Sequence, residues 1–376
     1  MAVLVMYLSL AGMLCWWAVM LAPWRAWTTR EKLEPSSYSE TKQSFDDVTV
    51  LIPARNEAQF IDQTLNRLQA QGKNLRIIVI DDQSEDHTAS LAGRPGVEVI
   101  PGTALPRNWS GKLWALEQGL QQVRTRYTLL LDADINLLPG ILETLLNKAR
   151  QEGLSLVSLM AELPVQRFSE RLLVPAFIFF FKLLYPFRLS NEPRSRMAAA
   201  AGGCILVETD VLRSIDAFTS IRHALIDDCA LAARVKQAGF RTWIGLSHAV
   251  QSHRGYDSLA AIWNTVARTA FTQLHYSLLL LLLCTLIMFS MFWCAPLSMI
   301  VYTDTIFVVC SILAWLAMFV VYTPVLRFYR NSPLWVIALP LIGILYLMMT
   351  WTSAFRYWRG VRAHWKNRRY ETSEHN

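Results

Sequence analysis

The chain has 376 residues, 53% of them hydrophobic, with a mean hydropathy of +0.27 and a formal net charge of +7. This length accommodates one domain of roughly 200–250 residues together with a membrane portion. Because the apolar excess lies at the two ends and the positive charge largely flanks the apolar segments, the composition favours anionic lipids as partners and argues against nucleic-acid binding.

The first apolar segment, Val3 to Leu21, is uncharged and of about membrane-spanning length. A signal peptide is the alternative, but no Lys or Arg precedes the segment and no small-x-small cleavage site follows it. We therefore expect a transmembrane anchor over residues 1–24 and a polar linker over residues 25–47. Arg25, Arg30 and Lys32 follow the anchor, and the positive-inside rule then predicts a cytoplasmic domain.

Residues 48–275 alternate between short apolar runs and helical patterns. Strands are predicted over 47–52, 76–81 and 97–100 and in the run ending at Asp132. Helices are predicted from Ile61, after residues 82–86 with Ser84 or Asp86 as N-cap, after Gly111 and near Pro139. The alternation predicts an α/β domain built on a doubly wound, mostly parallel sheet.

Three further apolar stretches, about 276–301, 305–322 and 334–355, are long enough to cross a bilayer. Buried core helices are the alternative, but the run Leu278 to Leu283 has no polar face. We expect about three transmembrane helices over 276–355 and a basic tail over 356–376. Three spans would put this tail outside the cell, against the charge rule, so the side of the tail stays open. The segment 171–188 fits either the membrane interface or the domain core.

Three acidic pairs lie in the polar region: Asp81-Asp82, Asp132-Ala133-Asp134 and Asp227-Asp228. The first two pairs end predicted strands, and ligands of open parallel sheets bind at the carboxyl ends of the strands. Clustered carboxylates repel one another unless a cation neutralises them. We therefore expect Asp132 and Asp134 to hold Mg²⁺ or Mn²⁺ carrying a diphosphate, with a helix-capping loop as the alternative.

Other polar residues in this region could contact the base, the ribose and the phosphates of a nucleotide. Asp82 can accept a hydrogen bond from a base N–H, and Glu57 can contact base or ribose, although turn and cap chemistry favours the same residue types. Lys112 follows Gly111 at a predicted helix N-terminus, which is a natural anion site.

Residues later in the chain could serve the molecule that accepts a transferred group. Asp227 and Asp228 precede a helical run, where they either cap the helix or supply a general base. Gly202 and Gly203 allow the backbone to approach a sugar closely. Arg268 can pair with pyrophosphate or a lipid headgroup, or can act as an interfacial anchor. The histidines and cysteines show neither metal-ligand nor disulfide spacing.

The polar region from about Val48 to Ser277 resembles family-2 glycosyltransferases of the GT-A fold. The motifs that carry the resemblance, in the family's order and spacing, are Pro53-Ala54-Arg55-Asn56-Glu57, Asp81-Asp82-Gln83-Ser84, Asp132-Ala133-Asp134 and Asp227-Asp228.

A closer resemblance is to the hopanoid-biosynthesis-associated (hopene-associated) membrane glycosyltransferases. It rests on five longer strings, at residues 109–115, 170–177, 198–204, 224–232 and 266–274. Processive family members carry Gln-x-x-Arg-Trp, whereas Thr265-Val266-Ala267-Arg268-Thr269 stands here. This departure favours transfer of a single sugar over polymer synthesis.

The resemblance also implies roles for individual residues. Asp228 would be the base of an inverting displacement, and Lys112 would approach the diphosphate. The donor-binding residues it implies are Pro53, Ala54, Glu57, Asp82, Lys112 and Asp132, the metal-binding pair Asp132 and Asp134, and the acceptor-side residues Gly202, Gly203, Asp227 and Arg268.

The expected protein is a multi-pass enzyme of the bacterial inner membrane that transfers one sugar from a nucleotide sugar, such as a UDP-sugar, to a membrane lipid, such as a hopanoid-related one. Transfer to polyprenyl phosphate is one alternative, in which a base would matter less. A non-catalytic lipid transporter or scaffold is the other, but the apolar spans contain almost no ionisable residues, which a polar-headgroup pathway would need.

Overall fold

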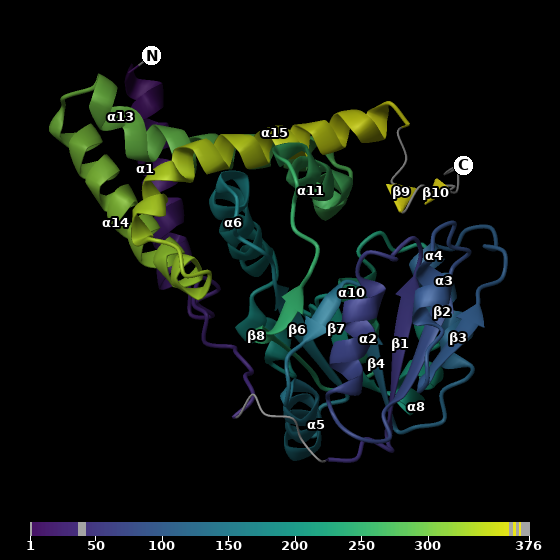
Figure 1. Cartoon of the computed structure of the whole chain (residues 1–376). Coiled ribbons are helices and arrows are strands. Elements are labelled where there is room, and N and C mark those ends of the chain that lie inside the picture. Colours follow the sequence, from purple (N-terminus) through teal and green to yellow (C-terminus); the bar gives the residue numbers. More distant parts are fainter. Residues whose placement is uncertain (1, 37–42, 361–363, 366–367, 370–376) are drawn as a thin grey trace. The chain divides into compact units, whose positions relative to one another are not determined.

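The computed structural model describes residues 2–36, 43–360, 364–365 and 368–369, so much of the basic tail expected over 356–376 lies outside the described residues. The chain divides into two compact units, which together make up the ribbon in Figure 1. We call residues 31–164, 187–255 and 362–376 the sheet unit. Residues 1–30, 165–186 and 256–361 form the helical unit.

The sheet unit contains an eight-stranded sheet in the order β3-β2-β1-β4-β7-β6-β8-β5. Its parallel pairs are β3-β2, β2-β1, β1-β4 and β6-β8, and the other neighbours are antiparallel. The sheet is therefore mixed and mostly parallel, as expected. The strands are β1 (Val48–Ala54), β2 (Arg76–Asp81), β3 (Val97–Pro101), β4 (Tyr127–Leu131), β5 (Ile135–Leu137), β6 (Leu156–Glu162), β7 (Cys204–Glu208) and β8 (Thr242–Ser252). A separate antiparallel pair joins β9 (His364–Trp365) and β10 (Arg368–Arg369).

Helices cover both faces of this sheet (Figure 1). They are α2 (Ile61–Gln69), α3 (Thr88–Ala92), α4 (Gly111–Leu120), α5 (Ile141–Glu152), α7 (Phe187–Asn191), α8 (Thr209–Ser214), α9 (Ala217–Ser220) and α10 (Asp227–Gln237). β1 is buried along its whole length, which is why its sequence is a nearly continuous apolar run. Residues of α2 and α5 share one core cluster with Val50 and Ile52, and residues of α4, α8, α9 and α10 share another with Leu51.

One small residue brings a helix close to the sheet. A Cβ on Gly119 of α4 would lie 2.7 Å from Cδ1 of Ile80 and 3.2 Å from Cδ2 of Leu51. The absence of a side chain at Gly119 therefore lets α4 pack tightly on β1 and β2. Lys112, the second residue of α4, lines a cavity together with Pro53 from the carboxyl end of β1.

Two expectations about this unit differ from the structure. The residue at the N-cap of α3 is His87, so the prediction of Ser84 or Asp86 was wrong. The carboxylate of Asp86, the residue before the N-cap, still accepts a hydrogen bond from the N–H of Thr88, at 2.9 Å. It therefore satisfies one backbone amide of the first helical turn. Strands β5 to β8 were not predicted, and each of the four is paired antiparallel with a neighbour on one side or both.

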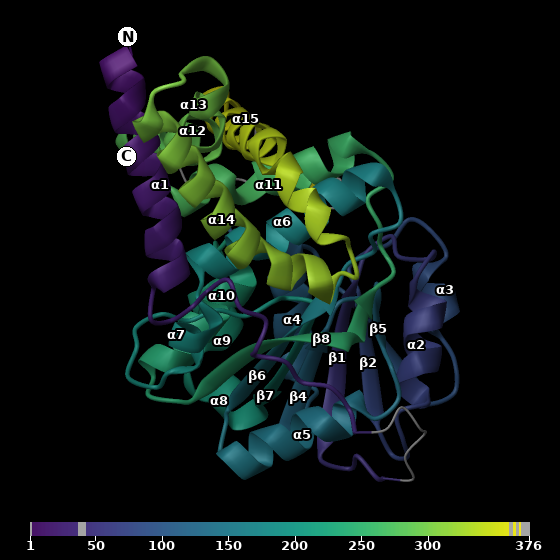
Figure 2. The ribbon, with the colours of Figure 1, turned by 90° about the vertical axis from the view of Figure 1, so that its left-hand side faces the viewer.

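The helical unit contains the apolar segments. Its helices are α1 (Ala2–Leu21), α6 (Phe168–Leu184), α11 (Leu259–Gln273), α12 (Leu278–Phe289), the π-helix η1 (Ser290–Cys294), α13 (Ala295–Val301), α14 (Thr305–Phe328), the 3₁₀ helix η2 (Pro333–Ala338) and α15 (Leu339–Trp358). Within the described residues, four helical stretches are long and apolar enough to span a membrane: 2–21, 278–301, 305–328 and 333–358. α1 packs beside α14, as Figure 2 shows.

The segment 171–188, for which the sequence left two readings open, is mostly the helix α6, and residues 165–186 group with the helical unit. Phe179 of α6 stacks on Trp16 of α1, with ring centroids 6.4 Å apart, and Phe180 lies 4.7 Å from the ring of Tyr346. The buried ammonium of Lys182 donates to the carbonyl oxygen of Thr28. α6 therefore joins the core of the apolar helices rather than the core of the sheet.

Candidate active site

The acidic residues predicted at strand ends do lie at one edge of the sheet. β2, β1 and β4 are parallel neighbours, so their carboxyl ends point the same way. Asp81 ends β2, and Asp132 follows the last residue of β4. The prediction that these motifs lie at the carboxyl ends of strands in one parallel sheet is confirmed, with β1 between β2 and β4, and such an edge is where open α/β sheets bind ligands.

Lys112 is the centre of an acidic cluster. Its ammonium lies 2.6 Å from a carboxylate oxygen of Asp132 and 4.0 Å from one of Asp227. These carboxylates and Asp228 raise the pKa of Lys112 above its usual range, against the opposing effect of burial, so the side chain stays charged. The cluster and Gly202 form the polar part of a cavity whose other walls are apolar side chains, Pro53 among them.

One lysine does not neutralise this many carboxylates. Burial raises the pKa of Asp132, and the nearby Asp134 and Asp227 raise it further, although Lys112 acts in the opposite direction. Burial, followed by the charge of Asp227, raises the pKa of Asp228 to about 6. The cluster therefore has an excess of negative charge that an additional cation would relieve.

Asp228 is held at the first turn of α10 by two backbone amides. The N–H of Gly202 donates to Oδ2 at 2.9 Å, and the N–H of Cys229 donates to Oδ1 at 2.7 Å. A Cβ on Gly202 would lie 3.2 Å from the ammonium of Lys112 and 3.4 Å from Asp228 Oδ2. Glycine at position 202 thus allows the backbone, the lysine and the carboxylate to meet. The result is a fixed carboxylate with a pKa near neutrality, which is suited to proton transfer.

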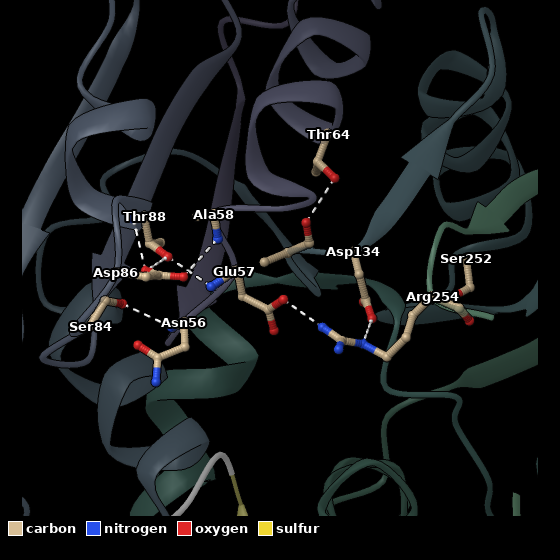
Figure 3. A network of polar contacts seen from close by, with 11 residues as sticks. Asn56, Glu57, Ala58, Thr64, Ser84, Asp86, Thr88, Asp134, Ser252 and Arg254 are labelled. Carbon is tan, nitrogen blue, oxygen red and sulfur yellow. Dashed lines mark hydrogen bonds and ion pairs between the residues drawn. The ribbon is translucent and has the colours of Figure 1, made fainter. Parts of the chain in front are cut away.

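The loops after β1 and β2 brace each other. The guanidinium of Arg55 donates to the carbonyl oxygens of Asp82 and Gln83, at 2.6 and 2.8 Å. The N–H of Asn56 donates to the hydroxyl of Ser84, and the N–H of Glu85 donates back to the Asn56 side chain (Figure 3 shows Asn56 and Ser84). Pro53, Ala54 and Asp82 are buried where these loops begin. The two motifs therefore form one rigid platform.

A second polar group joins Glu57 and Asp134 through Arg254 (Figure 3). The guanidinium lies 2.5 Å from Glu57 Oε2 through Nη2 and 2.6 Å from Asp134 Oδ2 through Nε. Glu57 follows β1 and is buried, whereas Arg254 comes two residues after β8. Sequence reasoning missed Arg254, because nothing in the local pattern shows that a residue 120 positions beyond Asp134 contacts it.

The remaining candidates are divided between the units. Gly203 lies at the site, since its carbonyl oxygen accepts the N–H of Asp132 at 3.1 Å. Arg268 is exposed on α11, in the helical unit. The structure therefore brings together Lys112, Asp132, Gly202, Asp227 and Asp228 in one cluster and Glu57 and Asp134 in the next, while Arg268 belongs to a different unit.

A divalent cation is compatible with the donor atoms at this edge. Asp132 and Asp134 present hard carboxylate oxygens of the kind Mg²⁺ and Mn²⁺ prefer. Among the described residues, no group of three or more His, Cys, Asp or Glu side chains is arranged to hold a metal. Two carboxylates are nevertheless enough for an ion whose other ligands are water and phosphate oxygens.

Part of the chain is similar to a known protein family. Residues 49–215 match the model of the family described as Glycosyl transferase family 2. Most of the matched residues lie in the sheet unit, which is therefore similar to a family-2 glycosyltransferase domain. The match covers fewer than half of the 376 residues and ends before Asp227, Asp228 and Arg254.

Curated relatives are glycosyltransferases as well. The chain is 34% identical over 110 residues to a 4,4'-diaponeurosporenoate glycosyltransferase of Staphylococcus aureus (strain USA300), covering 28% of this chain and 29% of that protein. It is 35% identical over 100 residues to the protein of the same name from Staphylococcus haemolyticus (strain JCSC1435), covering 26% of each. The matched segment thus spans less than a third of the length of these relatives.

A solved structure resembles nearly the whole chain. It is a mannosyltransferase from Pyrobaculum calidifontis in complex with GDP-Man and Mn²⁺, with a TM-score of 0.54, 16% identity, and coverage of 93% of this chain and 99% of that one. At this identity the likeness shows the fold alone. The GT-A fold expected for the glycosyltransferase domain is thereby confirmed.

Proposed function

We propose that the protein is a membrane-bound, inverting, metal-dependent glycosyltransferase that moves one sugar from a nucleotide sugar to a membrane lipid. The observation that carries the proposal is Asp228, a half-buried carboxylate whose pKa is raised to about 6 and which shares one cluster with Lys112 and Asp132. A base poised near neutrality, beside a cation that can meet a diphosphate, is what direct displacement at a sugar carbon requires.

In this reaction an acceptor hydroxyl passes its proton to Asp228 while its oxygen forms a bond to the anomeric carbon. The bond between that carbon and the diphosphate oxygen breaks, and the nucleoside diphosphate leaves with the electron pair. Lys112 stabilises the negative charge that grows on the leaving group. Asp227 adjusts the charge and position of its neighbour Asp228, and Gly202 fixes the carboxylate through its N–H.

Asp132 and Asp134 would hold the divalent cation, Mg²⁺ or Mn²⁺. The ion, when bound, neutralises the diphosphate and so improves it as a leaving group. The excess of carboxylates around Lys112 supports this assignment, and so does Mn²⁺ in the mannosyltransferase complex of similar fold. Pro53, Ala54, Glu57 and Asp82 would bind the nucleoside on the platform of the first two strand ends, with UDP as the first nucleotide to test.

A lipid acceptor agrees with the four apolar stretches and with the names of the relatives, which refer to a lipid-like carotenoid acid. Gly203 and Arg268 would serve the acceptor side. The resemblance to hopanoid-associated glycosyltransferases directs the first acceptor assays to hopanoids. We place the domain at the cytoplasmic face of a bacterial inner membrane, with Arg25, Arg30 and Lys32 near anionic lipids.

The test uses the full-length protein, purified in detergent and incubated with Mn²⁺, a UDP-sugar and a bacterial lipid extract, with products identified by mass spectrometry. One added hexose on a hydroxyl-bearing lipid is the expected result. A polyprenyl-phosphate sugar as the main product would reject the hydroxyl acceptor. If no nucleotide sugar tried is hydrolysed or transferred, while the protein remains folded, the non-catalytic alternative is favoured.

A further inference from the structure

Arg254 is placed between two residues with different proposed tasks. Its Nη2 contacts Glu57, a proposed nucleoside ligand, and its Nε contacts Asp134, a proposed metal ligand (Figure 3). The guanidinium also lies 4.7 Å from the ring centroid of Phe60, where a cation–π interaction adds to the ion pairs. An arginine side chain stays protonated at physiological pH, so Arg254 places a permanent positive charge between the two carboxylates.

The backbone fixes this position. β5 and β8 are antiparallel neighbours with Ile135 opposite Ser252, and the N–H of His253 donates to the carbonyl oxygen of Asp134 at 2.8 Å. Backbone hydrogen bonds therefore join the residues just before Arg254 to Asp134 and to the strand that follows it. The side chain of Arg254, in contrast, is 43% exposed, so the guanidinium can leave the two carboxylates without disturbing a core.

A guanidinium and a divalent ion compete for the same carboxylate oxygen, because each neutralises the charge that attracts the other and the two cations repel at short range. Asp132 is engaged in the same manner by Lys112. Lys112, however, belongs to a cluster that contains more carboxylates than it can neutralise. Arg254, in contrast, contacts two of the carboxylates drawn in Figure 3, those of Asp134 and Glu57. Metal binding at Oδ2 of Asp134 thus requires Arg254 to move.

We propose that Arg254 is a positioning residue that makes binding of the divalent cation depend on the nucleotide. Without nucleotide, Arg254 occupies Asp134 and Glu57 and weakens metal binding. A nucleoside diphosphate offers the guanidinium phosphate oxygens, which it binds well through paired N–H groups. Arg254 then releases Asp134 to the metal and Glu57 to the nucleoside. The inference rests on the proposed function, in which Asp134 is a metal ligand.

The test measures binding, not turnover. Mn²⁺ affinity of the full-length protein in detergent is determined by electron paramagnetic resonance, with and without UDP, for the wild type and for Arg254→Gln. Arg126→Gln is the matched control, since it removes the same charge from an exposed ion pair next to the first residue of β4, at the other end of that strand from Asp132. The double variant Arg254→Gln with Asp134→Asn tests whether the effect acts through Asp134.

We expect Arg254→Gln to bind Mn²⁺ in the absence of UDP roughly threefold to tenfold more tightly than the wild type, the range of a partly exposed, hydrogen-bonded ion pair. UDP should then improve Mn²⁺ binding less than it does in the wild type. The control should behave as the wild type, and the double variant should lose the gain. Arg254→Lys, which keeps the charge but lacks the fork of N–H groups that contacts Glu57 and Asp134 together, should fall between the wild type and Arg254→Gln.

Mn²⁺ binding by Arg254→Gln that is unchanged or weaker, in a protein with the thermal midpoint of the control, would overturn the role of Arg254. If the wild type still binds Mn²⁺ with UDP and loses it in Asp134→Asn, the proposed metal site stands even though this inference fails. Failure of every variant to bind Mn²⁺, with or without UDP, overturns both.

Discussion

The backbone N–H of Gly202 donates a 2.9 Å hydrogen bond to the carboxylate of Asp228. A residue 26 positions earlier in the chain thereby orients the proposed base from a loop that precedes β7, while the second oxygen is held by the amide of Cys229. The two amides leave the carboxylate little freedom to rotate, and Asp228 lines the same cavity as Lys112 and Asp132.

The first prediction concerns the base. Asp228→Asn keeps the shape of the side chain but removes its ability to accept a proton, so single-turnover transfer to a hydroxyl acceptor should slow by about 10²–10⁴-fold. Affinity for the nucleotide should change little. Asp227→Asn is the matched control and should be milder, because Asp227 only modifies the charge around Asp228. Normal transfer by Asp228→Asn would instead favour a phosphate acceptor, which is already nucleophilic.

The pH dependence of the reaction provides a second prediction. A base whose pKa is raised to about 6 is deprotonated above that pH and protonated below it. We therefore expect kcat/KM to be level above about pH 7 and to fall tenfold per pH unit well below pH 6. Measured on the residual activity of Asp228→Asn, the same profile should lack this acidic limb. A limb that persists in the variant would assign the titration to another group.

The third prediction tests the close approach at Gly202. In Gly202→Ala the new methyl carbon would lie 3.2 Å from the Lys112 ammonium and 3.4 Å from Asp228, so one of the two must shift by a few tenths of an ångström. Transfer should fall while the thermal midpoint changes little, because the atoms that move belong to the site. Gly93→Ala, whose added carbon meets only backbone oxygens at 3.5 and 3.6 Å, is the control. Equal activity of both variants would contradict the tight geometry.

The fourth prediction separates the metal site from the fold. Asp134→Ala should abolish the Mn²⁺ dependence of UDP-sugar binding, measured by calorimetry with and without the metal, and leave the protein folded. Asp210→Ala removes an aspartate whose side chain is 98% exposed and is the control. Persistence of metal-dependent affinity in Asp134→Ala would refute the assignment of Asp134 as a ligand.

The fifth prediction concerns topology. Gln151 is exposed on α5, in the sheet unit. If this unit is cytoplasmic, Gln151→Cys should resist a membrane-impermeant thiol reagent in intact cells and react after the cells are opened. The wild type, with its six native cysteines, sets the background. Rapid labelling in intact cells would reverse the orientation and remove access to cytoplasmic nucleotide sugars.

The parallel half of the sheet could be predicted because its signals are local. The strands at 76–81 and 127–131 are short apolar runs followed at once by acidic residues, and Ser110 caps α4 in the conventional way by accepting the N–H of Leu113. Their common edge follows from the rule that parallel strands present their carboxyl ends together. The position of these carboxylates at the ends of the strands could therefore be predicted from the sequence.

The antiparallel half and Arg254 could not be predicted, because they depend on contacts between distant residues. β5 has only three residues, and its partner β8 begins more than a hundred positions later. Without that pairing, nothing associates an arginine at position 254 with aspartate 134. The same limitation applies to the hydrogen bond between Gly202 and Asp228, since the double glycine predicts close backbone approach but not the atom approached.

The insertion of α6 between two parts of the sheet unit, in the order of the sequence, has a practical consequence for anyone who wishes to study the sheet unit alone. A fragment of residues 31–255 would include the sheet but would retain α6 without α1, α14 and α15. The rings of Phe179 and Phe180 would lose Trp16, Tyr322 and Tyr346, and the carbonyl oxygen that accepts Lys182 would be missing. Simple truncation should thus give an aggregating or detergent-dependent product. A soluble catalytic fragment requires residues 165–186 to be excised as well and the two flanking segments to be rejoined by a flexible polar linker.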